Sequence, residues 1–502
     1  QSHIVTPEHE MYGFNLALTP FPLLGHNRKY AYGLTMFEND DIDFYLEDSL
    51  QQFDIRKEVI KVKDEDDIIF EVKTGTHGPV MNGLLNNLDS TKNISMDWVY
   101  TRFSGDMIGV TYKISHAKSL REFRDGVSEI HAPGLNVMYG DADNNIAWFA
   151  AAKLYRHAEG ENTNLILDNR NGNKHVIEYF DFDQNPQAVN PPWNYVYSAN
   201  NQPGKVGDYL YPGYYVAEDR AKRIVQLLEA KKDFTGEDAK KMINDVQSAV
   251  APGLIRIISQ NLTKVSFTDN ENKALEILTK WDGNYTKNSV APVIYNKFLY
   301  LFLKMTFQDE MGVEGFDQFM ETHLSERQIA KQIKNKNSIW WDDVSTKHIK
   351  ENNDEIFTNA FHLTISQLEE QFGKELRDWT WDKALTVTHK HAFDKVAYLK
   401  GIFNVGPFQL DGGNEVINNQ IFDINEEGVY QITAGPSTRR IIDFSDIENG
   451  LTILPTGQSG NVLSKHYSNQ SEKFIRGEFV KMMLNKEEIE RSEDKLILKP
   501  VK

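Results

Sequence analysis

Residues 33–47, GLTMFENDDIDFYLE, place five acidic side chains directly after an apolar, strand-like run. Short segments rich in Val, Ile, Tyr and Phe surround this stretch and are separated by Gly, Asn and Asp, which is typical of antiparallel sheet. This pattern extends over residues 1–215. It is interrupted by a predicted helix at 117–129 and includes a hairpin with its turn at 143–145. The sequence therefore predicts an acid-rich loop beside a sheet.

A helical pattern replaces the strands over residues 216–383, and strand and turn signals return over 384–502. Thr235 and Asp238 have the spacing of a capping box. Residues 308–360 are polar and predict a surface helical excursion anchored by Trp340 and Trp341. Further helices are predicted at 250–263, 269–281, 291–307 and 364–378. We expect an α+β fold in which the three regions form one interleaved unit.

The composition excludes several classes of function. Lys and Arg total 55 against 73 Asp and Glu, a formal charge of -18, which argues against nucleic acid or an anionic membrane as partner. The absence of Cys excludes disulfides and a cysteine nucleophile within these 502 residues. The longest apolar runs are broken by Asn and Lys and are too short to span a bilayer. We expect a soluble protein whose targeting peptide is absent or removed.

The acidic stretch has two interpretations. Hard cations such as calcium need several oxygen ligands on an irregular loop, which Asp40, Asp41 and Asp43 can supply. A solvated acidic turn explains the same residues equally well. A second stretch, residues 141–145, begins like an EF-hand loop but lacks its later Gly and Glu, so a hairpin turn is the better interpretation.

Two further positions suggest chemistry. Asn200, in SANNQPG at 198–204, can direct an amide N–H at a developing oxyanion, although most Asn pairs only form turns. Arg220 stands where a helix begins, an unfavourable place for a cation, so either a specific electrostatic role or a surface Arg accounts for it. His26, His466 and the TGQSG segment at 456–460 are interpreted as structural, and no GxSxG elbow, P-loop or GxGxxG fingerprint occurs.

Several segments, in order, are similar to the β chain of the penicillin acylase family of N-terminal nucleophile hydrolases. The resemblance extends from about residue 20 to 475 and implies a four-layer αββα sandwich with a helical excursion. The matching segments are LLGHNRKYAYGLTMFENDDIDFY, HGPV, GDADNNIAW, SANNQPG, DRAKRI, WDG, GPSTRR and TGQSGNVLSKHY.

The resemblance implies a role for each matching residue. The main-chain N–H of Met36 and the side-chain amide of Asn200 would form an oxyanion hole, and Arg220 would support the nucleophile electrostatically. Leu24, Leu34 and Leu135 would line the acyl pocket. A structural calcium ion would be held by Asp40, the carbonyl of Ile42, Asp43, Asp208 and the backbone of Asn162.

One departure concerns the nucleophile, which in this family is an N-terminal Ser that uses its own α-amine as base. This chain opens with Gln1, and Ser2 matches a position inside a strand. We therefore expect the nucleophile, the first part of the β chain and the α chain to lie outside these residues, and the chain alone to be inert.

The resemblance predicts a periplasmic or secreted amidohydrolase that cleaves a small N-acyl amide through an acyl-enzyme. A β-lactam side chain, an N-acyl homoserine lactone and other N-acyl compounds all remain open as substrates. One alternative is a calcium-stabilised binding protein that keeps the fold without catalysis. A second is a carbohydrate-binding protein that uses the aromatic loop around Trp193 and Tyr195.

Overall fold

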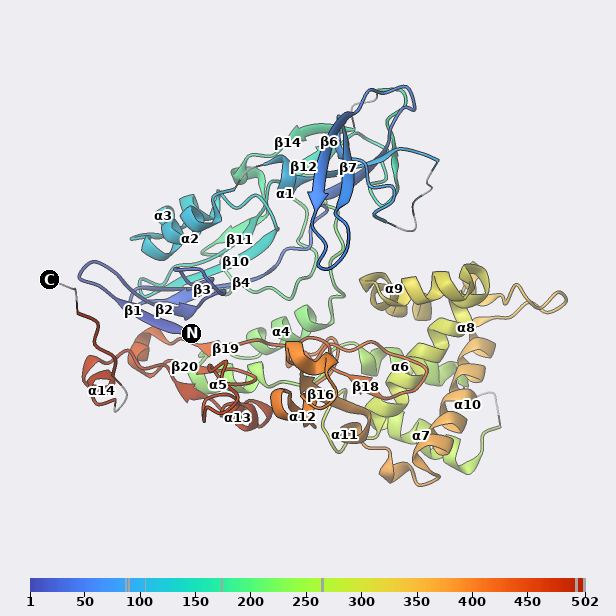
Figure 1. The fold of residues 1–502 in the computed structure, drawn as a ribbon. Coiled ribbons are helices and arrows are strands. Elements are labelled where there is room, and N and C mark those ends of the chain that lie inside the picture. The colour runs from blue at the N-terminus through green and yellow to red at the C-terminus, as the bar shows by residue number, and fades with distance from the viewer. Residues whose placement is uncertain are drawn as a thin grey trace. The chain divides into compact units, whose positions relative to one another are not determined.

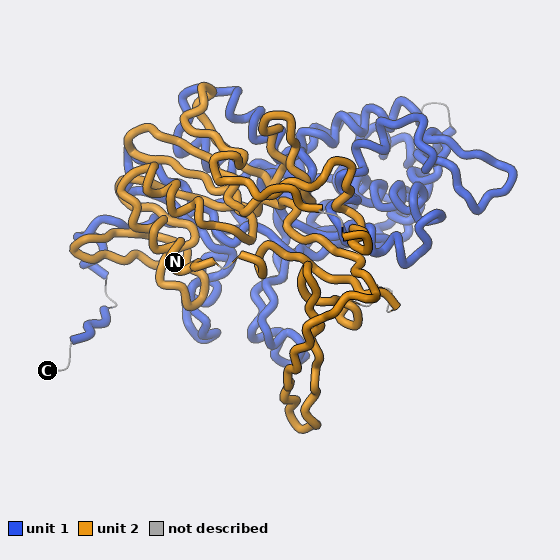
Figure 2. Tube along the Cα trace, turned by 90° about the horizontal axis from the view of Figure 1, so that it is seen from above, with its two compact units in different colours: residues 1, 216–502 blue, residues 2–215 orange. Residues whose placement is uncertain are grey.

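The computed structural model describes residues 1–85, 88, 91–103, 105–172, 175–262, 266–492 and 495–499. They form two compact units (Figure 2). The N-terminal unit is Ser2–Tyr215, and the C-terminal unit is Val216–Lys502 together with Gln1. The boundary lies where the sequence changes from strand to helix patterns, whereas the predicted change at 383/384 lies inside the C-terminal unit. None of the helices in the described ranges is long and apolar enough to cross a membrane.

A seven-stranded antiparallel sheet forms the centre of the N-terminal unit (Figure 1). Its central strands are rich in apolar residues, and consecutive residues such as Phe149 and Ala150, which point to opposite faces, are both buried. The spatial order is β1 (Ser2–Val5), β2 (Glu10–Phe14), β3 (Leu24–His26), β4 (Tyr30–Met36), β10 (Leu135–Asp141), β11 (Ile146–Ala151) and β15 (Gln187–Val189). The predicted hairpin turn joins β10 to β11 and is confirmed, with Asn144 at φ 66°.

Two helices pack on one face of this sheet, α2 (Met107–His116) and α3 (Leu120–Val127). The Tyr30 hydroxyl donates to the Ile114 carbonyl at 2.8 Å, and Phe123 packs against Tyr30 and Tyr139. The helix predicted at 117–129 is confirmed as α3, but α2 was not predicted. The residues of α2 include Gly and several β-branched types, which are poor helix formers, so tertiary packing rather than propensity decides this helix.

Smaller elements complete the N-terminal unit. Three short sheets are ordered β13-β5-β9, β6-β7-β8 and β12-β14. Their strands are β5 (Ile42–Leu46), β6 (Asp54–Ile60), β7 (Ile68–Gly75), β8 (Gly78–Pro79), β9 (Ile94–Trp98), β12 (Tyr155–His157), β13 (Leu167–Asp168) and β14 (Val176–Tyr179), with the helical turns α1 (Val99–Arg102) and η1 (Phe182–Gln184).

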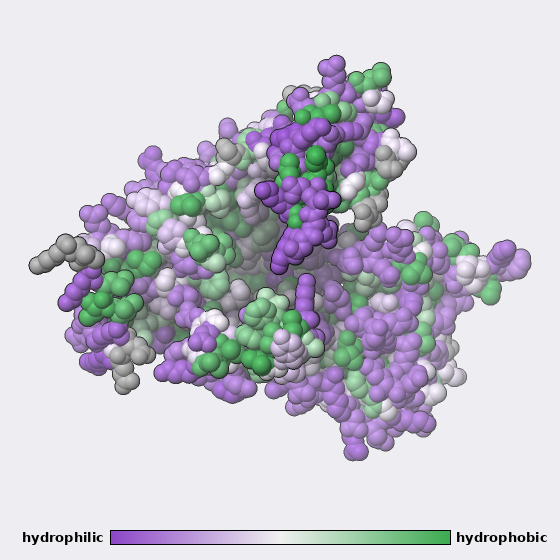
Figure 3. All heavy atoms as spheres, viewed as in Figure 1, coloured by the Kyte–Doolittle hydropathy of each residue, from purple (hydrophilic) through white to green (hydrophobic). Residues whose placement is uncertain are grey.

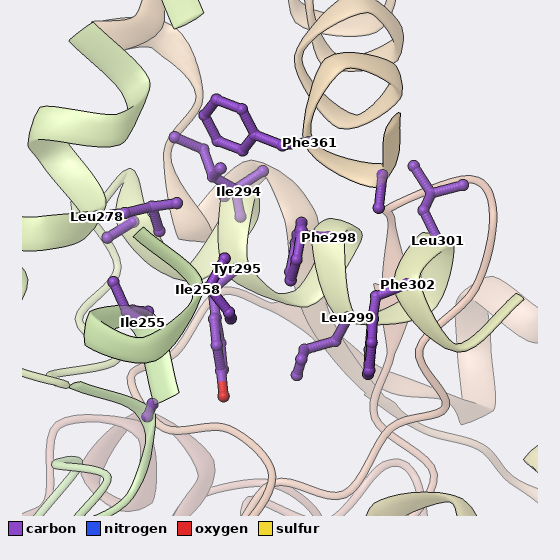
Figure 4. Packing of buried hydrophobic residues seen from close by; sticks show 14 of the residues in the cluster. Ile255, Ile258, Leu278, Ile294, Tyr295, Phe298, Leu299, Leu301, Phe302 and Phe361 are labelled. Atoms are coloured by element: carbon purple, nitrogen blue, oxygen red, sulfur yellow. The ribbon is translucent and has the colours of Figure 1, made fainter. Parts of the chain in front are cut away.

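The C-terminal unit contains most of the helices. Apolar faces of α6, α7, α8 and α10 meet in one core, part of which Figure 4 shows around Phe298, Phe302 and Phe361. The helices are α4 (Asp219–Glu229), α5 (Gly236–Ile243), α6 (Ala251–Leu262), α7 (Asp269–Lys280), α8 (Ala291–Met320), α9 (His323–Lys334), α10 (Asn353–Phe372), α11 (Trp381–Ala384), α12 (Lys400–Phe403), α13 (Ser471–Ile475) and α14 (Lys486–Glu490).

Several helix predictions hold, and two helices have other bounds. The Thr235–Asp238 capping box is present at the start of α5. Residue 263, where α6 was predicted to end, lies outside the described residues. Helix α8 continues to Met320 across a non-helical Gly312. Helix α10 begins well before the predicted residue 364, because a capping box of Asn352 and Glu355 starts it.

Two three-stranded sheets confirm the predicted return of strands in the C-terminal unit. The first has the order β17-β16-β18, and the second β19-β20-β21. The strands are β16 (Leu385–His389), β17 (Val405–Phe408), β18 (Tyr430–Gln431), β19 (Arg439–Ile441), β20 (Leu451–Ile453) and β21 (Val480–Lys481), and the remaining short turns are η2 (Ile339–Trp341), η3 (Leu376–Asp378), η4 (Ala392–Lys395) and η5 (Phe444–Asn449).

The hydrophilic character of the surface is consistent with the 25% of charged residues in the chain. On the face drawn in Figure 3, hydrophilic residues predominate and hydrophobic residues form scattered patches.

Candidate active site and acidic loop

The backbone of Met36, at the end of β4, faces an open sheet edge. The Phe37 N–H donates to the Gly134 carbonyl at 3.0 Å, so the adjacent pair, Met36 with Leu135, is a non-hydrogen-bonded pair. The N–H and C=O of Met36 therefore point away from β10. On that side β3 pairs only with residues 31 and 32, so no described strand pairs with Met36 there.

Asn200 fills part of this open edge. The Asn200 Nδ2 donates to the Met36 carbonyl at 2.9 Å. The loop that carries Asn200 is fixed to β4, because the hydroxyls of Ser198 and Thr35 lie 2.6 Å apart. Asn200 itself has a φ of 61°, a left-handed conformation that Asn tolerates better than most residues. Two residues predicted to share an oxyanion hole thus lie together.

A second carboxamide supports the same carbonyl. The Asn136 Nδ2 donates to the Met36 carbonyl at 2.9 Å, and the Trp148 Nε1 donates to the Asn136 Oδ1 at 2.9 Å. Asn136 is buried and fixed by the indole, whereas the Asn200 amide lies nearer to solvent. A main-chain N–H and a mobile carboxamide N–H at one edge are the donors that can stabilise an oxyanion.

The three predicted pocket leucines lie on neighbouring strands of the same sheet. Leu34 is two residues before Met36 in β4 and pairs with Val137, and Leu135 pairs directly with Met36. Both leucines are partly buried against the core beneath α2 and α3. Leu24, at the start of β3, is partly buried but lies on the opposite face, because its neighbour Gly25 pairs with Tyr32 on the face of Leu34. The prediction that the three leucines line one pocket therefore holds for Leu34 and Leu135 alone. The Met36 side chain, which is 41% exposed, shows that this apolar face reaches solvent near Met36.

Arg220, by contrast, belongs to the C-terminal unit, in the first turn of α4. Its side chain is only 14% exposed, and its Nε lies 3.7 Å from the Glu415 Oε2. Burial raises the pKa of Glu415, while the charge of Arg220 opposes that rise. The alternative of a surface Arg is therefore wrong.

The acidic loop after β4 turns its side chains inward rather than into solvent. Asp43 is 2% exposed, and its Oδ2 accepts hydrogen bonds from the Tyr155 hydroxyl at 3.1 Å and the His157 Nε2 at 3.0 Å. Its Oδ1 is buried and has no hydrogen-bond partner. The alternative of a solvated acidic turn therefore does not describe Asp43.

Asp40 lies close to this group. Burial raises the pKa of Asp40 to about 6; a hydrogen bond from Thr163 opposes the rise, and the nearby Asp43 carboxylate adds to it. The Asp40 N–H donates to the Pro212 carbonyl at 3.0 Å, which ties the acidic loop to the segment that follows Asn200. Three segments of the N-terminal unit therefore meet at Asp40 and Asp43.

The other predicted calcium ligands are arranged less favourably. Asn162 is exposed; its carbonyl accepts from the Leu165 N–H, and its side chain accepts from Asn164. Asp208 is also exposed. Among the residues that the structure describes, no group of three or more His, Asp or Glu side chains has the spacing of a metal site. Asp40 and the unpartnered oxygen of Asp43 fit a divalent cation, whereas the side chain of Asn162 does not.

Ser2 lies in a strand, as the sequence predicts. Ser2 begins β1, and its Oγ donates to the Asn15 Oδ1 at 2.9 Å, which confirms a position inside a strand. The α-amine of Gln1 donates to the Gln458 Oε1 at 2.5 Å.

Sequence reasoning missed three residues that support this site, Thr35, Asn136 and Ser198, and it missed Glu415, which pairs with Arg220 in the C-terminal unit. Asn136 had a usable signal, because a polar residue at a core-facing spacing in an apolar strand requires a buried partner. The others had none, since their contacts join segments distant in sequence.

Comparisons with known proteins agree with this arrangement. The chain shares its fold with a solved structure, a thermostable penicillin G acylase from Alcaligenes faecalis, at a TM-score of 0.71 and 17% identity, over 100% of this chain and 94% of that one. The fold is thus the α+β fold of the N-terminal nucleophile hydrolases. The chain belongs to the penicillin amidase family, whose model matches residues 1–491.

Curated relatives are closer in sequence than the solved structure and also cover nearly all of the chain. Acyl-homoserine lactone acylase QuiP of Pseudomonas aeruginosa is 25% identical over 97% of this chain and 63% of its own length. Penicillin acylase 2 proenzyme of Pseudomonas sp. strain SE83 is 22% identical over 94% of this chain and 61% of its own length. The chain thus spans less than two thirds of the length of these relatives.

Proposed function

We propose that this chain is most of the β chain of an amidohydrolase that cleaves a small N-acyl amide through an acyl-enzyme. The observation that carries the proposal is the 2.9 Å contact between Asn200 and the Met36 carbonyl at an edge of β4 without a strand partner. Family membership and the names of the relatives support an acylase.

In this proposal, the Met36 N–H and the Asn200 amide bind the oxygen of the scissile carbonyl as it gains negative charge. Asn200 would exchange its bond to the Met36 carbonyl for one to the substrate oxygen, while Asn136 keeps that carbonyl satisfied. One such donor typically lowers the activation free energy by roughly 3 kcal/mol. Arg220 would support the nucleophile by its positive charge.

The acyl group would lie against Leu34 and Leu135, whereas Leu24 lies on the opposite face of the sheet. Leu34 and Leu135 flank Met36 on the same sheet face, so an apolar chain bound there would place its carbonyl near the Met36 N–H. This favours an apolar acyl group, as in an N-acyl homoserine lactone or a penicillin with an aromatic side chain.

A calcium ion, if bound, would be held by Asp40, Asp43 and the Ile42 carbonyl, with Asp208 and Asn162 as weaker candidates. It would neutralise the buried Asp40 and Asp43 carboxylates and join the loops that carry them. The ion would have a structural role only.

The nucleophile and an α chain would come from parts of the protein outside these residues. Adjoining cavities lie in the C-terminal unit. A cavity of about 590 Å³ beside β16 and β18 shares His389 and Lys390 with a second one, which shares Ser459 with a third. Gln458, which binds the α-amine of Gln1, lines that third cavity. We also propose a periplasmic or secreted location.

The proposal is tested with the full-length protein, incubated with N-acyl homoserine lactones of several chain lengths and with penicillin G. We expect release of the free amine, and a decrease in turnover of about a hundredfold for Asn200→Ala with an unchanged melting temperature. Asn272→Ala, in α7, is the matched control and should be neutral.

Two outcomes would count against the proposal. Wild-type turnover in Asn200→Ala would remove Asn200 from the mechanism. Tight binding of N-acyl compounds without any turnover would instead support a calcium-stabilised binding protein of the same fold. Residues 1–502 expressed alone should be inactive in either case.

A further inference from the structure

Arg220 occupies a position that the helix itself disfavours. It lies in the first turn of α4, where the helix dipole favours anions over cations. The N-cap residue, Glu218, makes no side-chain capping bond. A buried cation at this end needs a compensating negative charge from elsewhere in the fold.

Glu415 supplies that charge when it is ionised, and although burial raises its pKa, the charge of Arg220 favours the ionised form. Its Oε2 lies 3.7 Å from the Arg220 Nε, and the side chains of Glu415 and Arg220 are only 18% and 14% exposed. Glu415 also has a φ of 57°, a left-handed conformation that is rare for Glu and strained. Such a conformation persists only where the surrounding structure fixes it.

The loop around Glu415 is fixed to the helical core by main-chain contacts. The Gly412 N–H donates to the Tyr285 carbonyl at 2.9 Å, and the Trp381 Nε1 donates to the Gly412 carbonyl at 2.8 Å. The Lys287 N–H donates to the Asp411 Oδ1 at 2.7 Å. The segment before Glu415 therefore has little freedom to move.

The same loop is joined to α4 through Asp245. The Asn418 N–H donates to the Asp245 carbonyl at 2.8 Å. The Asp245 carboxylate accepts both the Nε and the Nη2 of Arg223, at 3.0 and 2.6 Å. Arg223 lies one helical turn after Arg220. The bidentate Arg223–Asp245 pair therefore fixes the distance between Arg220 and Glu415.

Other charged groups surround the pair. Asp219 on α4 and Glu326 on α9 raise the pKa of Glu415, and His323 on α9 lowers it, although burial is the largest cause of its rise. The Glu415 carboxylate forms an ion pair with Arg220.

We propose that Glu415 is a positioning residue, which holds the Arg220 guanidinium in the orientation that the reaction uses. This inference rests on the proposed function, because Arg220 acts there on the surroundings of the nucleophile. Glu415 itself would touch neither the substrate nor the reacting atoms.

The test uses the full-length protein and the variant Glu415→Gln, which keeps the size of the side chain and removes its charge. We expect kcat to fall by about tenfold to a hundredfold with little change in KM, because misplacing a catalytic group costs turnover more than binding. Glu218→Gln, an exposed neighbour on the same helix, is the control and should retain wild-type turnover.

A double-mutant cycle shows whether Glu415 acts through Arg220. In the background of Arg220→Lys, the further change Glu415→Gln should lower kcat by less than threefold. A full additional loss in that background would overturn the inference, as would wild-type kcat for Glu415→Gln alone. If Glu415→Gln does not fold, Glu415→Asp is measured in the same cycle, with the same criterion.

Failure of the proposed function would be distinguishable from failure of this inference. If the full-length protein hydrolyses no N-acyl amide, the function is wrong, and the pair is then tested by the NMR resonance of the Arg220 Nε–H. Glu415→Gln should shift that resonance while Glu218→Gln leaves it unchanged. An unshifted resonance in Glu415→Gln would contradict the pairing.

Discussion

The hydroxyl groups of Thr35 and Ser198 lie 2.6 Å apart, although 163 residues separate them in sequence. This contact joins the end of β4 to the loop that carries Asn200. The Asn200 N–H also donates to the Ser198 Oγ at 3.3 Å, so one hydroxyl fixes both the strand and the backbone of Asn200. The Ser198 hydroxyl therefore helps to position the Asn200 amide by fixing the backbone that carries it.

We expect Ser198→Ala to reduce turnover in the full-length protein by roughly tenfold, since it frees the loop without removing the Asn200 amide. The measurement is kcat and KM with the best N-acyl substrate. Ser198→Thr keeps the hydroxyl and should recover most of the activity. Equal losses in the two variants would mean that the hydroxyl is not what positions Asn200.

Glu47 is expected to contribute strongly to the stability of the N-terminal unit. Its side chain is fully buried and accepts from the Ser95 Oγ at 2.5 Å, the Asn169 Nδ2 at 2.8 Å and the His77 Nδ1 at 3.0 Å. Glu47→Leu leaves these donors unpaired and should lower the free energy of unfolding by roughly 3 kcal/mol in urea titrations. Glu71→Leu on the exposed hairpin is the control. If Glu47→Leu lowered the free energy of unfolding no more than Glu71→Leu does, this role of Glu47 would be refuted.

The pH dependence of Glu47 has a definite sign. Burial raises the pKa of Glu47, but hydrogen bonds from Ser95, Asn169 and His77 outweigh burial and lower that pKa below its usual value. Because the folded-state pKa is depressed, the contribution of Glu47 to stability is present above about pH 4.5 and is lost as the pH falls through the folded pKa. Glu47→Gln should therefore lose less stability than wild type on acidification.

Removal of calcium should destabilise the protein if the acidic loop binds it. A chelator should lower the melting temperature, because a ligand present at a hundred times its Kd stabilises the folded state by about 2.7 kcal/mol. Asp43→Asn should abolish this response. Asp143→Asn, in the hairpin turn after β10, should retain it. A melting temperature that no chelator changes would contradict the calcium proposal.

Asp219 should make stability decrease as the pH rises. Burial raises the pKa of Asp219 to about 6, the charge of Lys222 opposes the rise and Glu326 adds to it. The folded state therefore binds more protons than the unfolded state between about pH 4 and 6, so its stability is greatest below that window and declines through it. Asp219→Asn should flatten this decline, measured as the free energy of unfolding at several pH values, and the exposed Asp233→Asn should not.

Local patterns in the sequence predicted much of the fold. Alternation predicted the strands of the N-terminal unit, and the capping box at Thr235 predicted the start of α5. The prediction failed at α2, whose β-branched residues resemble a strand, because Val110 and Ile114 make a helix there by packing against the sheet. Local propensity is a weak force, and tertiary burial overrides it.

The sequence by itself determined the α+β class, the family resemblance, and the candidates Met36, Asn200, Arg220, Asp40 and Asp43, because motif spacing and periodicity are local properties of a chain. Only the tertiary structure decided that the Asn200 amide reaches the Met36 carbonyl, that Asp43 faces Tyr155 and His157, and that Glu415 opposes Arg220. Each of these contacts joins residues far apart along the chain, and the pairing of such residues depends on strand register and burial, which the whole fold sets.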